Sequence, residues 1–81
     1  MESWPEFVVV PAWPGRGGVE METRYAAEGP DLVLPVFSSV TALVAILGHD
    51  QPWVCVALVD ARETAAAAGL ARVVIDPEAM P

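Results

Sequence analysis

The feature that most constrains the fold is the most apolar stretch of the chain, residues 32–58, which reads LVLPVFSSVTALVAILGHDQPWVCVAL. It contains two continuous apolar runs, 32–37 and 53–58, which predict strands covered on both faces. Between the runs, apolar residues recur at helical spacing: Val40, Leu43, Val44 and Leu47. Gly48 follows where a left-handed cap would end a helix. The stretch therefore predicts strand, helix, strand.

Three further residues refine this prediction. Ser38 and Ser39 precede the helix and can cap its first turn. Pro35 lacks a backbone N–H, which favours an edge strand or a bulge for the run 32–37.

The segments before this stretch predict a hairpin. Residues 7–10 are apolar and are followed by Pro11, which predicts a short first strand. The Pro- and Gly-rich residues 11–18 predict a loop that carries Trp13. Residues 19–26 alternate between apolar and polar side chains, the pattern of a half-exposed strand.

After the central stretch, a second helix and a last strand are expected. Asp60 and Glu63 have the spacing of a capping box, which predicts a helix from Asp60 to about residue 68, with Gly69 after it. Residues 71–75 predict the final strand, closed by Asp76 and Pro77.

Together these elements predict one domain over residues 1–81, with frayed ends at 1–6 and 78–81. The expected class is α/β in the broad sense that includes α+β. The expected architecture is a two-layer sandwich in which a five-stranded mixed sheet carries two helices on one face, in the order ββ-βα-βα-β.

Apolar residues on both faces of the predicted strands indicate that the second sheet face needs a cover. We expect a homo-oligomer, in the simplest case a homodimer, or a protein partner on that face, with cover by the N-terminal segment as the alternative. Trp13, Tyr25 and Trp53 are the predicted partner-binding residues, because aromatic side chains concentrate at binding hot spots.

Charge and composition exclude several classes of function. The formal net charge is −7, with four arginines and no lysine, which disfavours nucleic acid and anionic membranes as partners. No apolar run approaches the roughly 20 residues of a membrane span. The acidic N-terminus is unlike a secretory signal, so we expect a cytoplasmic protein. Cys55 is the single cysteine, and its apolar surroundings predict a buried hydrophobe rather than a disulfide, zinc ligand or reactive thiol.

No catalytic, metal or cofactor site is predicted. His49 and Asp50 adjoin after the first helix, but a helix of about nine residues would hold Ser38 and Ser39 more than ~12 Å away. Gly15 to Gly18 lack the spacing of a phosphate-binding loop. We therefore predict a non-enzymatic interaction domain. The alternative is a small-molecule binder or minor enzyme that uses the His49/Asp50 loop.

The chain also resembles a known family. Phe37, Ser38 and Ser39 after an apolar strand, a helix, a second apolar strand, an Ala-rich helix and a last strand ending in Asp76-Pro77 resemble the SseB-like (enhanced serine sensitivity) N-terminal domain of actinobacterial type. The resemblance extends over most of the chain from Phe7 onward. It implies a small α/β domain without established catalytic residues.

Overall fold

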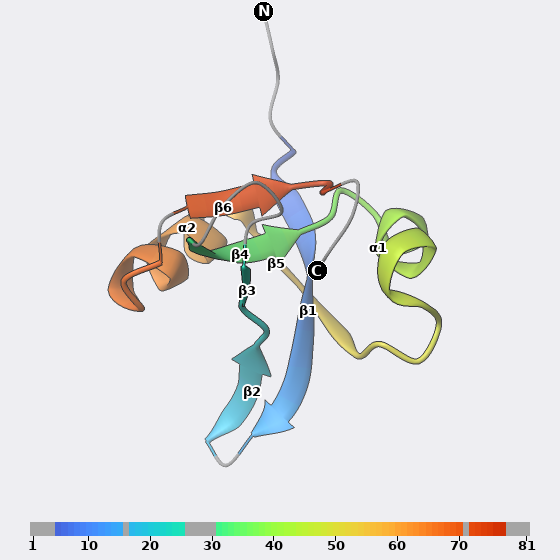
Figure 1. The fold of residues 1–81 in the computed structure, drawn as a ribbon, viewed down its shortest axis with the longest axis horizontal. Helices are drawn as coiled ribbons and strands as arrows, with labels where there is room; N and C mark the ends of the chain where they lie inside the picture. Colours follow the sequence, from blue (N-terminus) through green and yellow to red (C-terminus); the bar gives the residue numbers. More distant parts are fainter. Residues whose placement is uncertain (1–4, 16, 26–30, 71, 78–81) are drawn as a thin grey trace, which may run out of the picture.

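The computed structural model describes residues 5–15, 17–25, 31–70 and 72–77, which fold into a small α+β structure (Figure 1). The predicted broad class is therefore confirmed. The elements are, in chain order, β1 (Phe7–Gly15), β2 (Gly18–Met21), β3 (Arg24–Tyr25), β4 (Leu32–Val36), α1 (Val40–Leu47), β5 (Trp53–Ala57), α2 (Leu58–Ala67) and β6 (Arg72–Ile75).

The strands form two three-stranded sheets instead of the single five-stranded sheet expected. One sheet has the order β2-β1-β5 with antiparallel neighbours, and the other has the order β3-β4-β6 with β4 parallel to β6. A bridge between Val9 and Phe37 joins them, with N···O distances of 2.7 and 2.8 Å in the two directions. β5 thus pairs with the N-terminal strand and not with its neighbours in sequence.

β1 continues through residues 11–15, which were expected to form a loop. Pro11 accepts a hydrogen bond from the Glu22 N–H through its carbonyl. In an antiparallel strand a residue's N–H and C=O point to the same side, so the donor missing at Pro11 faces the end of β2 and not β5. The next residue, Ala12, donates to the Pro52 carbonyl on the β5 side. By the same alternation, the donor missing at Pro14 faces the β5 side, where the β1–β5 register has stopped at Pro11 and Trp53. Neither proline therefore removes a hydrogen bond between paired strands.

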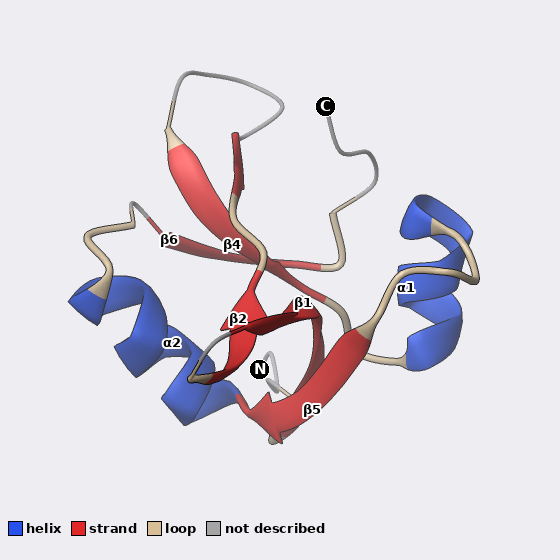
Figure 2. Ribbon diagram, turned by 90° about the horizontal axis from the view of Figure 1, so that it is seen from below, coloured by secondary structure: helices blue, strands red, loops and turns tan. Residues whose placement is uncertain are grey.

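The two helices lie on opposite sides of β1 (Figure 2). Val8 and Val10 pack in a cluster with Leu34, Val36 and three residues of α2: Leu58, Ala61 and Ala65. Val9, which points the other way, packs with Phe37 and with Leu43 of α1. The expected placement of both helices on one sheet face is therefore wrong. The alternation of β1 gives each helix its own apolar side.

The ends of α1 follow the prediction. Ser39 is the N-cap, and its hydroxyl accepts from the Ala42 N–H at 3.1 Å. Gly48 ends the helix at φ 91°, a value that glycine adopts without steric strain.

The start of α2 differs from the prediction. The helix begins at Leu58, directly after β5, and its N-cap Ala57 makes no side-chain capping bond. The Leu58 N–H donates instead to the Glu6 carbonyl at 2.9 Å, so backbone at the start of β1 satisfies it. Asp60 lies in the first turn, where its charge suits the helix dipole, and the expected capping box is absent.

β4 is the central strand of its sheet, so the expected edge position of Pro35 is wrong. β3 pairs only with Leu32 and Val33, and Pro35 has a registered partner on the β6 side, Val74. The missing donor is tolerated because β3 does not extend alongside this residue. The residues 33–36 are all buried, as predicted for a strand covered on both faces.

Candidate docking surface

One face of the sheet β2-β1-β5 carries most of the large exposed apolar side chains of its strands. Alternate residues of β1 share this face, and in the β1–β5 register Phe7 is opposite Ala57, Val9 opposite Cys55 and Pro11 opposite Trp53. Phe7 is 56%, Trp13 47% and Trp53 44% exposed. We call this surface the Trp face and define it by Phe7, Trp13, Trp53 and Cys55. Helix α1 covers its middle, at Val9, and leaves both ends open.

The hairpin of β1 and β2 projects away from the rest of the molecule (Figure 1). A notch lies where this hairpin leaves the start of β5, and residues of both sheet faces line it: Trp13 and Trp53 belong to the Trp face, and Ala12, Pro14, Val19 and Val54 alternate to the opposite face. It is a hollow of about 390 Å³. Its lining is apolar and comes from Ala12, Trp13, Pro14, Gly18, Val19, Pro52, Trp53 and Val54. Trp13 and Trp53, which are 40 residues apart in sequence, thus line one hollow.

Carboxylates border Trp13. Glu20 is its cross-strand partner and is exposed, and the Trp13 Nε1 donates to Glu22 Oε1 at 3.4 Å. Glu22 is the diagonal neighbour, a position within reach of an aromatic side chain. Trp13 therefore joins the apolar lining of the notch to a negatively charged rim formed by these two carboxylates.

The structure places the predicted partner-binding residues as follows. Trp13 and Trp53 are exposed and line the same notch. Trp13, however, lies in strand β1 and not in a loop, so sheet pairing holds its backbone. The backbone of Tyr25 pairs with Leu32 in β3, and its side chain lies outside the described part of the structure.

Cys55 is exposed, so the prediction of a buried thiol is wrong. β5 is an edge strand and α1 covers only part of the face that Cys55 shares. Apolar neighbours in sequence indicated burial, but they do not show which face of an edge strand another element covers.

Sequence reasoning missed Phe7 and Val19 as surface residues. Both were assigned to strands, and both are more than half exposed, at 56% and 58%. Phe7 could have been found from its position at the first residue of a strand, where cover from neighbouring elements ends.

His49 and Asp50 lie in the turn after α1 and are exposed. Ser39, the serine that caps α1, stands at the opposite end of that helix, with its hydroxyl engaged by the Ala42 N–H. The structure therefore does not bring this serine to the histidine. Among the described residues, no group of three His, Cys, Asp or Glu side chains could hold a metal ion. Within that same part of the chain, no helix is long and apolar enough to cross a bilayer.

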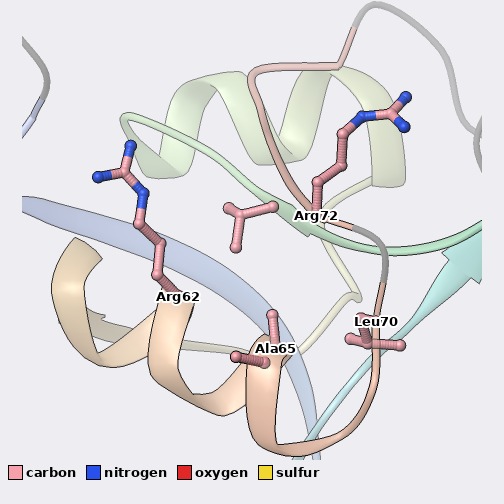
Figure 3. A pocket seen from close by; sticks show the side chains of 6 residues that line it. Arg62, Ala65, Leu70 and Arg72 are labelled. Carbon is pink, nitrogen blue, oxygen red and sulfur yellow. The ribbon is translucent and has the colours of Figure 1, made fainter.

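A second hollow, of about 310 Å³, lies between α2 and β6. Arg62 and Arg72 project on either side of it, and Ala65 and Leu70 lie below them in the view of Figure 3. Arg72 Nη1 is 4.0 Å from Asp31 Oδ2. An anion bound in this hollow would compete with that carboxylate, so the Trp face is the stronger candidate.

Compared with known protein families, with curated proteins and with solved structures, the chain has no match.

Proposed function

We propose that this chain is a small non-enzymatic interaction domain that binds a protein through the Trp face. The observation that carries the proposal is that Trp13 and Trp53, each about half exposed, line one hollow, while Phe7 is exposed at the other end of the same sheet face. Exposed aromatic residues around a hollow are the usual anchors of protein interfaces. An apolar patch of this kind on a small protein marks an interaction site.

The notch suggests the chemistry of the partner. Its apolar lining fits one bulky aliphatic or aromatic side chain, and the carboxylates of Glu20 and Glu22 favour Lys or Arg beside that anchor. The formal charge of −7 would attract such a segment over a longer range. The proposed partner is therefore a protein segment with an apolar anchor flanked by basic residues.

Site-specific photo-crosslinking in the native host tests this proposal. A photoreactive phenylalanine analogue at Trp13 should give a discrete adduct whose partner peptide contains basic residues. The matched control is the same analogue at Val59, which is 61% exposed on α2 and lies away from the Trp face. Equal labelling from Trp13 and Val59, or no adduct from Trp13, would overturn the proposal.

The negative rim gives a second test with the captured partner. Replacing both Glu20 and Glu22 by Gln should weaken binding about tenfold at low salt and much less at 0.5 M salt, because screening removes rim electrostatics. The control is Glu63→Gln on α2, which removes one charge far from the notch. A loss that is the same at both salt concentrations would show that charge does not contribute.

We also propose that the chain is an SseB-like N-terminal domain and that it lies in the cytoplasm. The resemblance implies no established catalytic residues, which is consistent with an interaction role. The alternative role for His49 and Asp50 is less favoured, because both are exposed and the capping serine is at the far end of α1.

A further inference from the structure

The pairing of β1 determines which backbone groups of β5 face outward. Val9 uses both its N–H and its C=O to bond Phe37, on the side away from β5. Val9 and its partner Cys55 therefore form a non-hydrogen-bonded pair. The alternate pairs, Phe7 with Ala57 and Pro11 with Trp53, are non-hydrogen-bonded as well. The N–H and C=O groups of Trp53 and Cys55 consequently point away from β1, along the outer edge of β5.

This outer edge is open within the described part of the chain, where β5 is the last strand of its sheet. Natural edge strands are usually protected from pairing by a charge, a proline or a bulge. β5 has the sequence WVCVA, with none of these three features, and its five residues pair with β1 in continuous register. Such a strand is a template for another strand.

We propose that the occupant of this edge is the β5 strand of a second copy, antiparallel to the first about a two-fold axis at Cys55. This inference goes beyond the proposed function, because it places a second copy at the β5 edge in addition to the basic partner proposed at the notch. The pairing would join two three-stranded sheets into one six-stranded sheet. It is isologous, because the same edge is used by both copies.

The register centred on Cys55 is the one that uses all five residues of β5. In this register, residues whose backbone N–H and C=O point to the outer edge lie opposite residues of the same kind in the partner copy, as a hydrogen-bonded ladder requires. Trp53 lies opposite the partner copy's Ala57, Val54 opposite its Val56, and Cys55 opposite its own counterpart. A large residue therefore faces a small one at both ends of the strand.

The same register accounts for two exposed aromatic side chains. Ala57 is paired with Phe7 in β1, so Trp53 of one copy lies two strands, or ~10 Å, from Phe7 of the other. Only the small side chain of Ala57 lies between them. The Trp53 and Phe7 rings, now 44% and 56% exposed, would cover each other across the joint.

Charge is consistent with a second copy as the occupant. Two chains of formal charge −7 repel each other, but β5 itself carries no charge. Glu20 lies on β2 and Glu22 directly follows it, at the opposite edge of the same sheet. Self-pairing at β5 therefore keeps these groups apart.

Backbone-directed variants of Cys55 test the proposal. Cys55→Pro removes an N–H that faces outward and leaves the β1–β5 hydrogen bonds in place, whereas Cys55→Ala keeps that N–H. Wild type and Cys55→Ala should have a solution mass twice 8.6 kDa at high concentration. Cys55→Pro should raise the dimer dissociation constant about tenfold or more. Far-UV circular dichroism checks that each variant is folded.

A charge exchange tests the register and does not depend on Cys55→Pro folding. Cys55→Arg and Cys55→Glu should each be monomeric alone, since like charges would lie opposite each other. Mixed in equal amounts, they should form a heterodimer. A short bismaleimide should also crosslink wild-type chains through Cys55, the single cysteine. A wild-type monomer at all concentrations, or a dimer that persists in both charge variants, would overturn the inference.

The outcome can be separated from that of the proposed function. Monomeric wild type with a specific adduct at Trp13 would remove the self-pairing and leave the interaction role in place. A dimer that Cys55→Pro weakens, together with no adduct at Trp13, would support edge pairing and remove the external partner.

Discussion

Asp76 connects the ends of three elements through two hydrogen bonds. Its N–H donates to the Val36 carbonyl at 2.8 Å, and its Oδ1 accepts from the Ser38 N–H at 2.7 Å. Its φ of 50° lies in the left-handed region, which Asp and Asn tolerate better than other side chains. This residue therefore holds the end of β6 against the passage from β4 to α1.

Replacing Asp76 by Ala should destabilise the protein by about 1–3 kcal/mol, because the Ser38 N–H loses its acceptor and alanine is strained at positive φ. Asp76→Asn keeps an oxygen acceptor and tolerates the same backbone conformation, so it should cost less than ~1 kcal/mol. Urea unfolding of both variants checks this order. Equal losses would show that the side-chain oxygen contributes nothing.

Cys55 shows a limit of residue patterns. The sequence WVCVAL is apolar at every position, so alternation cannot distinguish a covered face from an open one. Exposure of Trp53 and Cys55 follows from the place of β5 at the edge of its sheet, which depends on a partner strand 46 residues earlier, at Val9.

At the scale of elements, the two helices begin in different ways. Helix α1 has the side-chain cap that its sequence predicts, whereas α2 follows β5 without one and relies on the Glu6 carbonyl. A local signal sufficed for α1 because its cap is made within four residues. The start of α2 depends on a contact from the other end of the chain.

Ser39→Ala should lower the free energy of unfolding by about 1 kcal/mol, since the Ala42 N–H loses its capping acceptor. The control is Ser38→Ala: Ser38 is engaged through its backbone N–H, so loss of its hydroxyl should change stability by no more than about 0.5 kcal/mol. Thermal and urea unfolding of the two variants measure the difference. A larger loss in Ser38→Ala would contradict the assignment of the cap.

At the scale of the whole molecule, β1 is the element shared by both core clusters. Its alternate residues pack with α2 on one side, through Val8 and Val10, and with α1 on the other, through Val9. Neither cluster is large, and a domain of 81 residues has little stability to spare. We therefore expect the two sides to unfold together.

Leu43→Ala tests this coupling. Leu43 is fully buried in the α1 cluster, so the cavity should cost about 2–5 kcal/mol. The tryptophan fluorescence and the far-UV circular dichroism should then change in one transition, at a lower denaturant concentration than in the wild type. Val40→Ala, at a position 36% exposed on the same helix, should have little effect. Separate transitions for the two signals would show that the sides of β1 unfold independently.

The sequence by itself determined the elements whose signals are local: β4, α1 with its Ser39 cap and Gly48 end, β5 as a strand, and the presence of α2 but not its start. Only the tertiary structure decided that β5 pairs with β1, that the helices lie on opposite sides, and that Cys55 is exposed. The physical reason is range: caps and periodicity act within about one helical turn, whereas strand pairing and cover depend on residues brought together from distant parts of the chain.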